Sequence, residues 1–358
     1  MVVLLLAACG RIGFEPRDDA RTDGAVAGPA TVQTGRAQLV PGTSQIAVTI
    51  SPVDLEHSLL TFSLSVTDVK PDDVKVTGRF LDESQVQFVR AGSEQTIEIR
   101  WTAVSWSGMT VRRGVGGLDN SSTTFTAAID PPVDVARSFV IATHRDQGNA
   151  FGDDEYIDFE LAAPDTLVGR NRAQNSVTTT VAWQVVELDA GVVHHGRSTI
   201  APVTTLELAT TPSFDPTRAW LVYTSSATGG APTEAQHYAI SGRIVDSTQL
   251  AFERAGGDGT ALISWSLIEL AAGHVEHGST TFADGELVQT AMPEPVDLAR
   301  SFVFGGSFGG MGGRTTSIDQ GPGPAWVMAE LQDSTGLELI RGVSTGTTVA
   351  PWSVITLE

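Results

Sequence analysis

Cysteine and lysine are scarce in this sequence: its 358 residues include one cysteine, Cys9, and two lysines, Lys70 and Lys75. A single cysteine excludes a disulfide within the chain, so an apolar core must stabilise the fold. Positive charge is also scarce, because 22 basic residues stand against 42 acidic ones and give a net charge of −20. This balance argues against nucleic acid and anionic membrane surfaces as partners, because both attract basic proteins.

The sequence also lacks helical periodicity. No stretch of ten or more residues spaces its apolar side chains at the 3.6-residue period of an amphipathic helix. Apolar and polar residues alternate instead, as in TIEIRWTAV, TTTVAWQVVEL and ALISWSLIEL. With 41% apolar residues and 37 glycines for turns, the sequence predicts an all-β chain of antiparallel strands.

Four sequence markers recur in a fixed order, four times over, which is the signature of repeated structural units. They are a tryptophan on a long apolar strand, a glycine after the next turn, an aspartate three residues before a basic residue, and an arginine that ends a hairpin. The tryptophans are Trp101, Trp183, Trp265 and Trp352, the glycines are Gly35, Gly114, Gly196 and Gly278, the aspartates are Asp54, Asp134, Asp215 and Asp297, and the arginines are Arg90, Arg170, Arg254 and Arg341.

These markers predict four tandem antiparallel β-sandwich repeats of about 80 residues, each with six strands. The predicted divisions are 1–8 for a signal peptide, 9–31 for a lipidated tether, and 32–109, 110–191, 192–273 and 274–358 for repeats 1 to 4. The junctions are very short, so we expect the repeats to be held rigidly. Consecutive repeats would then pair edge to edge or exchange a strand, and either arrangement would cover exposed strand edges.

The N-terminal run MVVLLLAAC resembles the bacterial lipobox, in which a signal peptide is cut before a cysteine that carries diacylglycerol. The run is too short to span a bilayer as a helix. The resemblance implies lipidation of Cys9 and a place in the cell envelope, and Gly10 after the cysteine favours the outer membrane or the cell surface. The membrane would then be contacted only through the lipid anchor. A chance cysteine in an apolar N-terminus is the alternative.

The segment STTFTAAIDPPVDVARSFVIATHRD, followed later by VAWQVVEL, is similar in order and spacing to the F…PP.V…W pattern of the H-type lectin family. The resemblance covers repeat 2 best and the other repeats through their similarity to it. It implies a six-stranded antiparallel sandwich and calcium-independent sugar binding, usually at oligomer edges. No sugar-contacting residue of that family maps onto this chain, so function rests on fold analogy.

The marked residues have structural interpretations. The residues two positions after each tryptophan share its face and are apolar, as Val185 is, so we expect the indoles in the core. The repeated aspartates are expected to close a turn onto backbone N–H groups, with the basic residue pairing beside them.

The sequence offers no convincing metal, cofactor or catalytic site. His194 and His195 point to opposite faces of a strand, and so do His274 and His277. The stretch FGDDEY (151–156) lacks the spacing of a calcium loop. We find no nucleophile beside a base and no phosphate-binding loop, so we do not expect an enzyme.

The segment after the third strand of each repeat differs in length and chemistry, while the frame around it recurs. These segments give the candidate binding loops around His144, Phe151, Tyr238 and Phe308. Variable loops on a fixed scaffold are typical of recognition. The predicted function is a multivalent binding or adhesion module for a glycan or a cell-surface protein, with an oligomer as an open possibility. The alternative is a structural surface protein, a rigid spacer or assembly subunit without a small ligand.

Overall fold

The computed structural model describes residues 29–67, 70–148, 150–152, 155–172, 177–228, 234–305, 311–319 and 321–358. In these residues the chain is all-β and folds into small antiparallel sheets, with two α-helices of four residues each. No helix in the described ranges has the length and apolar character needed to cross a membrane. Cys9 and Phe308 lie outside the described residues.

The strands pair in four successive sets, which we call units 1 to 4. Unit 1 contains β1 (Thr31–Leu39), β2 (Gln45–Thr49), β3 (Ser58–Ser65), β4 (Thr77–Asp82), β5 (Gln85–Val89) and β6 (Ile97–Ser105). Unit 2 contains β7 (Met109–Leu118), β8 (Thr124–Ala128), β9 (Ser138–Asp146), β10 (Ile157–Ala163), β11 (Thr166–Asn171) and β12 (Thr179–Leu188). Unit 3 contains β13 (Gly191–Ile200), β14 (Thr205–Ala209), β15 (Ala219–Thr228), β16 (Ser241–Asp246), β17 (Gln249–Glu253) and β18 (Thr260–Leu270). Unit 4 contains β19 (His274–Phe282), β20 (Val288–Ala291), β21 (Ser301–Phe304), β22 (Met311–Gly312), β23 (Arg314–Thr315), β24 (Trp326–Leu331), β25 (Leu337–Arg341) and β26 (Thr348–Thr356).

Every unit shares one arrangement of six strands in two sheets, to which unit 4 adds β22 beside β24 and β23 beside β26. In one sheet, the unit's last long strand lies between its first and third strands, as in β7-β12-β9. In the other, the hairpin strand lies between the second and fourth strands, as in β14-β17-β16. Short helical turns precede the third and fourth strands: η1 (Leu55–His57), η2 (Val135–Arg137), α1 (Pro71–Val74) and α2 (Ala235–Tyr238).

The tryptophan and glycine markers face each other across one strand pair. Trp183 of β12 lies opposite Gly114 of β7, and the same register joins Trp265 to Gly196 in unit 3. A Cβ atom on either glycine would collide with the indole ring, so the ring needs a bare backbone beneath it. Trp101, Trp183 and Trp352 are buried in the cores of their own units, as expected, and Trp265 is partly buried against the core of unit 3.

The aspartate marker caps the turn before the third strand, as the sequence predicts. The Asp134 carboxylate accepts a hydrogen bond from the Ala136 backbone N–H at 3.0 Å and pairs with Arg137 at 3.0 Å. Asp215 and Asp297 form the equivalent caps and ion pairs. These turns fix where each third strand enters its sheet.

The hairpin arginine is a buried anchor in three units, and its predicted position in unit 2 is wrong by one residue. Arg254 is 2% exposed and donates only to backbone carbonyls, including those of Ala201 and His237. In unit 2 the equivalent position is Asn171, because its N–H donates to the Thr123 carbonyl as the N–H of Arg254 donates to that of Thr204. Arg170 is partly exposed instead and pairs with Glu160. The strand register places Arg170 one step before the anchor.

The four units close into a ring. β4 contacts β9 and β12, β10 contacts β15, β16 contacts β26, and β24 contacts β3. One apolar cluster takes residues from all four units, including Trp106, Ile141, Val222 and Phe302. The units therefore share a core that no single unit could bury.

This arrangement overturns the expectation that neighbouring repeats pair edge to edge or exchange strands. In the described residues each first strand pairs with the last strand of its own unit, and the units meet through sheet faces. The faces meet because the last strands carry apolar side chains on both sides. On β12, Val185 packs inside the unit and Val186 packs in the shared core.

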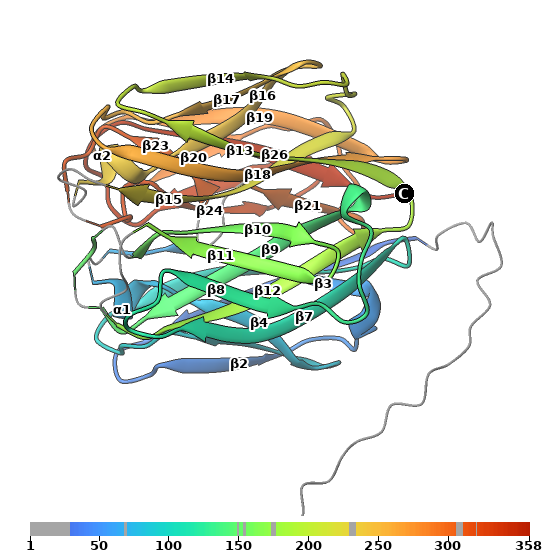
Figure 1. Cartoon of the computed structure of the whole chain (residues 1–358), viewed down its shortest axis with the longest axis horizontal. Helices are drawn as coiled ribbons and strands as arrows, with labels where there is room; N and C mark the ends of the chain where they lie inside the picture. The colour runs from blue at the N-terminus through green and yellow to red at the C-terminus, as the bar shows by residue number, and fades with distance from the viewer. Residues whose placement is uncertain are drawn as a thin grey trace, which may run out of the picture.

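The two ends of the ring differ. α1 and α2 lie at the left end in Figure 1, and the C-terminus lies at the opposite end. Residues of the shared core flank the short junctions between units, as Trp106 and Met109 do between β6 and β7. The segments that the sequence singles out as variable begin where the third strands end, on the side of the two helices.

Candidate functional site

One position in the frame is occupied by a different residue in each unit, and the four residues meet at one cavity. In each unit the anchor on the hairpin strand lies opposite, across the sheet, a residue at the start of the fourth strand. The position in question is one residue before that opposite residue, and its occupants are Lys75, Tyr156, Ala239 and Trp326. All four line a cavity of about 90 Å³. We call this place the convergent site, and define it by Lys75, His144, Tyr156, Tyr238 and Trp326.

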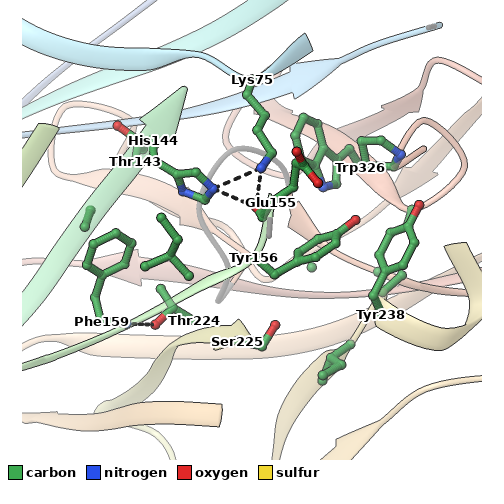
Figure 2. A pocket seen from close by; sticks show the side chains of 18 of the residues that line it. Lys75, Thr143, His144, Glu155, Tyr156, Phe159, Thr224, Ser225, Tyr238 and Trp326 are labelled. Atoms are coloured by element: carbon green, nitrogen blue, oxygen red, sulfur yellow. Dashed lines mark hydrogen bonds between the residues drawn. The ribbon is translucent and has the colours of Figure 1, made fainter. Parts of the chain in front are cut away.

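Lys75 provides the positive centre of the convergent site. Its ammonium lies 2.9 Å from Asp146 Oδ2, and the two side chains are 3% and 2% exposed. It also donates to the carbonyl of Glu155 and lies 3.1 Å from Nε2 of His144. Figure 2 shows the triangle of contacts that Lys75, His144 and Glu155 form. The charge is thus engaged within the protein and does not point free into the cavity.

His144 is neutral at physiological pH. Its imidazole is buried, and this burial together with the nearby Lys75 charge lowers its pKa to about 3. Its Nε2 lies 2.9 Å from the Glu155 carbonyl. Because a neutral imidazole with so low a pKa is a weak base, His144 is suited to hydrogen bonding more than to proton abstraction.

An aromatic wall forms the other side of the site. The rings of Tyr156 and Tyr238 lie 4.6 Å apart, and Phe151 stacks on Tyr238 at 6.4 Å. Trp326 stands beside them in Figure 2. Burial raises the pKa of both phenols, so both stay protonated.

The two phenol hydroxyls are the unusual groups of this wall. Both oxygens are buried. They interact with each other, and that of Tyr238 also with the Gly321 backbone, but none of these contacts has normal hydrogen-bond geometry. By contrast, the hydroxyl of Tyr223 donates to the Ile240 carbonyl and accepts from the Gly242 N–H. A buried hydroxyl without a well-aligned partner costs part of the ~1–3 kcal/mol of a fully unsatisfied group, so it requires an explanation.

No protein-family model matches this sequence, and no curated protein matches it. The convergent site must therefore be interpreted from its own residues.

The structure brings together three of the four predicted loop residues. His144 and Tyr238 line the cavity, and Phe151 packs against Tyr238. Phe308 lies outside the described residues, although Gly312 and Gly313 of the same variable segment line the cavity. The variable loops therefore meet at one place in the ring.

Sequence reasoning missed Lys75, Asp146, Tyr156 and Trp326. Two signals were available: Lys75 is one of only two lysines, and Tyr156 is one of only three tyrosines. Neither composition signal says that residues of different units share a cavity, because that depends on closing the ring.

The paired histidines hold neighbouring units together. Nε2 of His195 donates to the Val135 carbonyl at 3.0 Å, and Nε2 of His277 donates to the Pro216 carbonyl at 3.0 Å. Arg113 takes the same place between units 1 and 2 and donates to the Ser58 carbonyl. Nowhere in the described ranges do three or more His, Cys, Asp or Glu side chains gather closely enough to hold a metal ion.

A larger cleft of about 270 Å³ lies between units 3 and 4, but its polar groups are already engaged. Nδ1 of His277 accepts from Ser353, Trp352 Nε1 donates to Thr280, and Arg243 pairs with Glu253. The side chains of His277, Trp352 and Arg243 are therefore already bonded within the protein, and the convergent site is the stronger candidate.

Proposed function

We propose that the chain is a cell-surface binding module whose ligand is a glycan, and that the glycan enters the convergent site. The observation that carries the proposal is the pair of buried hydroxyls on Tyr156 and Tyr238, which lack a partner of normal hydrogen-bond geometry. A sugar hydroxyl would supply well-aligned partners, and sugar C–H faces would lie on the aromatic wall.

The size of the cavity narrows the ligand. At about 90 Å³ it is smaller than the cavity of about 150 Å³ that holds a benzene ring. A substituent of a sugar, such as a hydroxymethyl or acetamido group, would enter, while the ring itself stayed at the rim beside Trp326.

Charge also favours a neutral ligand. The Lys75 Nζ atom is already engaged: it pairs with Asp146, donates to the Glu155 carbonyl and lies beside His144. An anionic ligand would find no free cation there, and it would meet a protein of net charge −20.

One composite site per chain changes how affinity would arise. The repeated sequence markers predicted several binding sites along one chain. With one site per ring, avidity would come from many chains side by side. Anchoring through a lipid on Cys9 at the outer membrane or cell surface would provide that density, and we propose it on the sequence pattern alone.

The test of the binding function is a glycan array, followed by calorimetry with the best glycan. Tyr238→Phe removes one of these hydroxyls without changing the ring, and it should weaken binding about tenfold or more, the scale of one lost hydrogen bond in a buried site. Thr210→Val is the control, because it removes a buried hydroxyl that lies outside the convergent site, and it should leave the affinity unchanged.

Two outcomes would contradict the proposal. An array without any binding would leave the structural alternative, an assembly subunit without a small ligand. Binding that Tyr238→Phe leaves unchanged would place the ligand elsewhere on the ring.

A further inference from the structure

Lys75 and Asp146 form a buried pair that joins two units. Lys75 precedes β4 in unit 1, and Asp146 ends β9 in unit 2. Nζ of Lys75 lies 2.9 Å from Oδ2 of Asp146, and both side chains are at most 3% exposed. The other lysine, Lys70, is 39% exposed and pairs with Glu94 on the surface.

The surroundings of this pair are aromatic. The Nζ atom lies 5.6 Å from the ring centre of Phe151 and 5.5 Å from that of Tyr156. Transfer of one proton from the nitrogen to the oxygen converts such an ion pair into an amine beside a carboxylic acid, and neither of these groups carries a charge.

The neutral amine would be aimed at the acid. One of its N–H groups has its acceptor in the Glu155 carbonyl, to which Nε2 of His144 also donates. The nitrogen can then turn its lone pair toward Asp146, whose Oδ2 lies 2.9 Å away. Such alignment of reacting atoms replaces a large part of the entropic barrier to bond formation.

We propose that Lys75 and Asp146 join in an intramolecular amide bond, formed by the folded protein itself. The Lys75 nitrogen attacks Cγ of the protonated Asp146 carboxyl group and forms a C–N bond. One carboxyl oxygen then leaves with two protons as water. The sum is one ammonium plus one carboxylate giving one amide and one water, so no oxidant or activating co-reactant is needed.

Glu155 is positioned to carry protons in this step. A methyl group built on Gly148 would lie 2.8 Å from Oε1 of Glu155 and 3.3 Å from Oδ1 of Asp146. The two carboxyl groups therefore lie close to each other, on either side of this position. A buried carboxyl beside the reacting one can take a proton from the attacking nitrogen and return it to the departing oxygen. His144 acts as a positioning residue for the amine.

The scarcity of lysine makes the test direct. The purified protein is denatured and digested with a protease that cleaves only after lysine, and the fragments are weighed by mass spectrometry. Only the bond after Lys75 is open to this protease, because Pro71 follows Lys70 and a Lys–Pro bond resists cleavage. A free Lys75 therefore gives a fragment 76–358. A crosslinked Lys75 resists cleavage, so the chain stays uncut and is lighter than its sequence mass by one water.

The expected result is an uncut chain that lacks one water. A second digestion after arginine, with peptide fragmentation, should place the branch between Lys75 and Asp146. Cleavage after Lys75, or loss of water at any other position, would overturn the proposal. Because the unaltered protein gives the answer, the test does not depend on a variant that folds.

Two variants sharpen the result. Asp146→Ala removes the electrophile, so a cut after Lys75 should appear and the missing water should return. Lys70→Arg is the matched control: it changes the other lysine and should leave the chain uncut and one water lighter. A water still missing in Asp146→Ala would show that the bond lies elsewhere.

Discussion

The backbone N–H of Val32 donates to the carbonyl of Ala299 at 2.9 Å, and this contact ties the first strand of the chain to unit 4. Its equivalent between units 3 and 4 is the bond from the Val275 N–H to the Thr217 carbonyl at 2.7 Å. The contact that closes the ring is therefore of the same kind as the contacts within it. No unit is a free end, and each packs against a neighbour on both sides.

Closure predicts that the ring unfolds as one cooperative body. A fragment of residues 191–270 keeps all six strands of unit 3 but exposes Trp220, Val222 and Ile268 of the shared core. We expect this fragment to remain unfolded or aggregated, while residues 29–358 give one transition in chemical denaturation. A fragment with the same midpoint as the whole ring would contradict the shared core.

Much of the fold follows from sequence patterns, because those patterns report local geometry. Alternating strands, the aspartate turns and the buried tryptophans each depend on neighbours within one unit. Asp134 caps its turn through the N–H of Ala136, two residues away, and a short motif captures such a relation. These predictions are confirmed.

The ring and the convergent site depend on relations between units, which a repeat pattern does not encode. Val186 and Leu188 point away from the unit's own core into the shared one, and apolar residues on both faces of a strand are the signal for two-sided burial. The sequence also does not reveal that Lys75 and Tyr156 occupy equivalent positions in units 1 and 2, because the segments before them differ in length. Since the two residues are also of different types, no repeated motif marks the position.

The contact between Gly196 and Trp265 predicts a sharp steric effect. Gly196→Ala places a methyl group inside the indole ring, and relief requires either the ring or β13 to move. We expect a loss of about 2–3 kcal/mol in the free energy of unfolding. Gly257→Ala is the matched control, since its Cβ would meet only ordinary contacts at 3.8 Å or more. Equal effects of the two substitutions would show that the indole does not need the bare backbone.

The buried Arg254 predicts a large difference between arginine and lysine. Its guanidinium donates to several carbonyls around one loop, including those of Val203 and Gly259. A lysine ammonium reaches fewer of them, so Arg254→Lys should lower the free energy of unfolding by about 3 kcal/mol. Arg243→Lys on the surface should change it by less than about 0.5 kcal/mol. Urea denaturation of both variants checks this, and a tolerated Arg254→Lys would argue against the anchor.

The aspartate caps predict how stability changes in acid. The hydrogen bond from Arg137 and the backbone N–H of Ala136 hold the pKa of Asp134 below 3.8, its value in an unfolded chain. The pKa values of Asp215 and Asp297 are lowered in the same way by their turn residues and paired arginines. A carboxyl group with a lowered folded pKa stabilises the fold above its unfolded pKa. That contribution is lost as the pH falls from 3.8 through the folded pKa.

The triple variant Asp134→Asn, Asp215→Asn, Asp297→Asn isolates this effect. Asparagine still caps the turn but neither titrates nor pairs with arginine. At neutral pH the melting temperature of the unaltered protein should exceed that of the variant by a few degrees. The gap should shrink as the pH falls from about 5 to about 3, because protonation removes the pairing that the variant already lacks. All other carboxyl groups are common to both proteins and cancel in the difference. Calorimetric scans across this range give the measurement, and a gap that stays constant or widens in acid would show that the caps do not carry their stabilising charge.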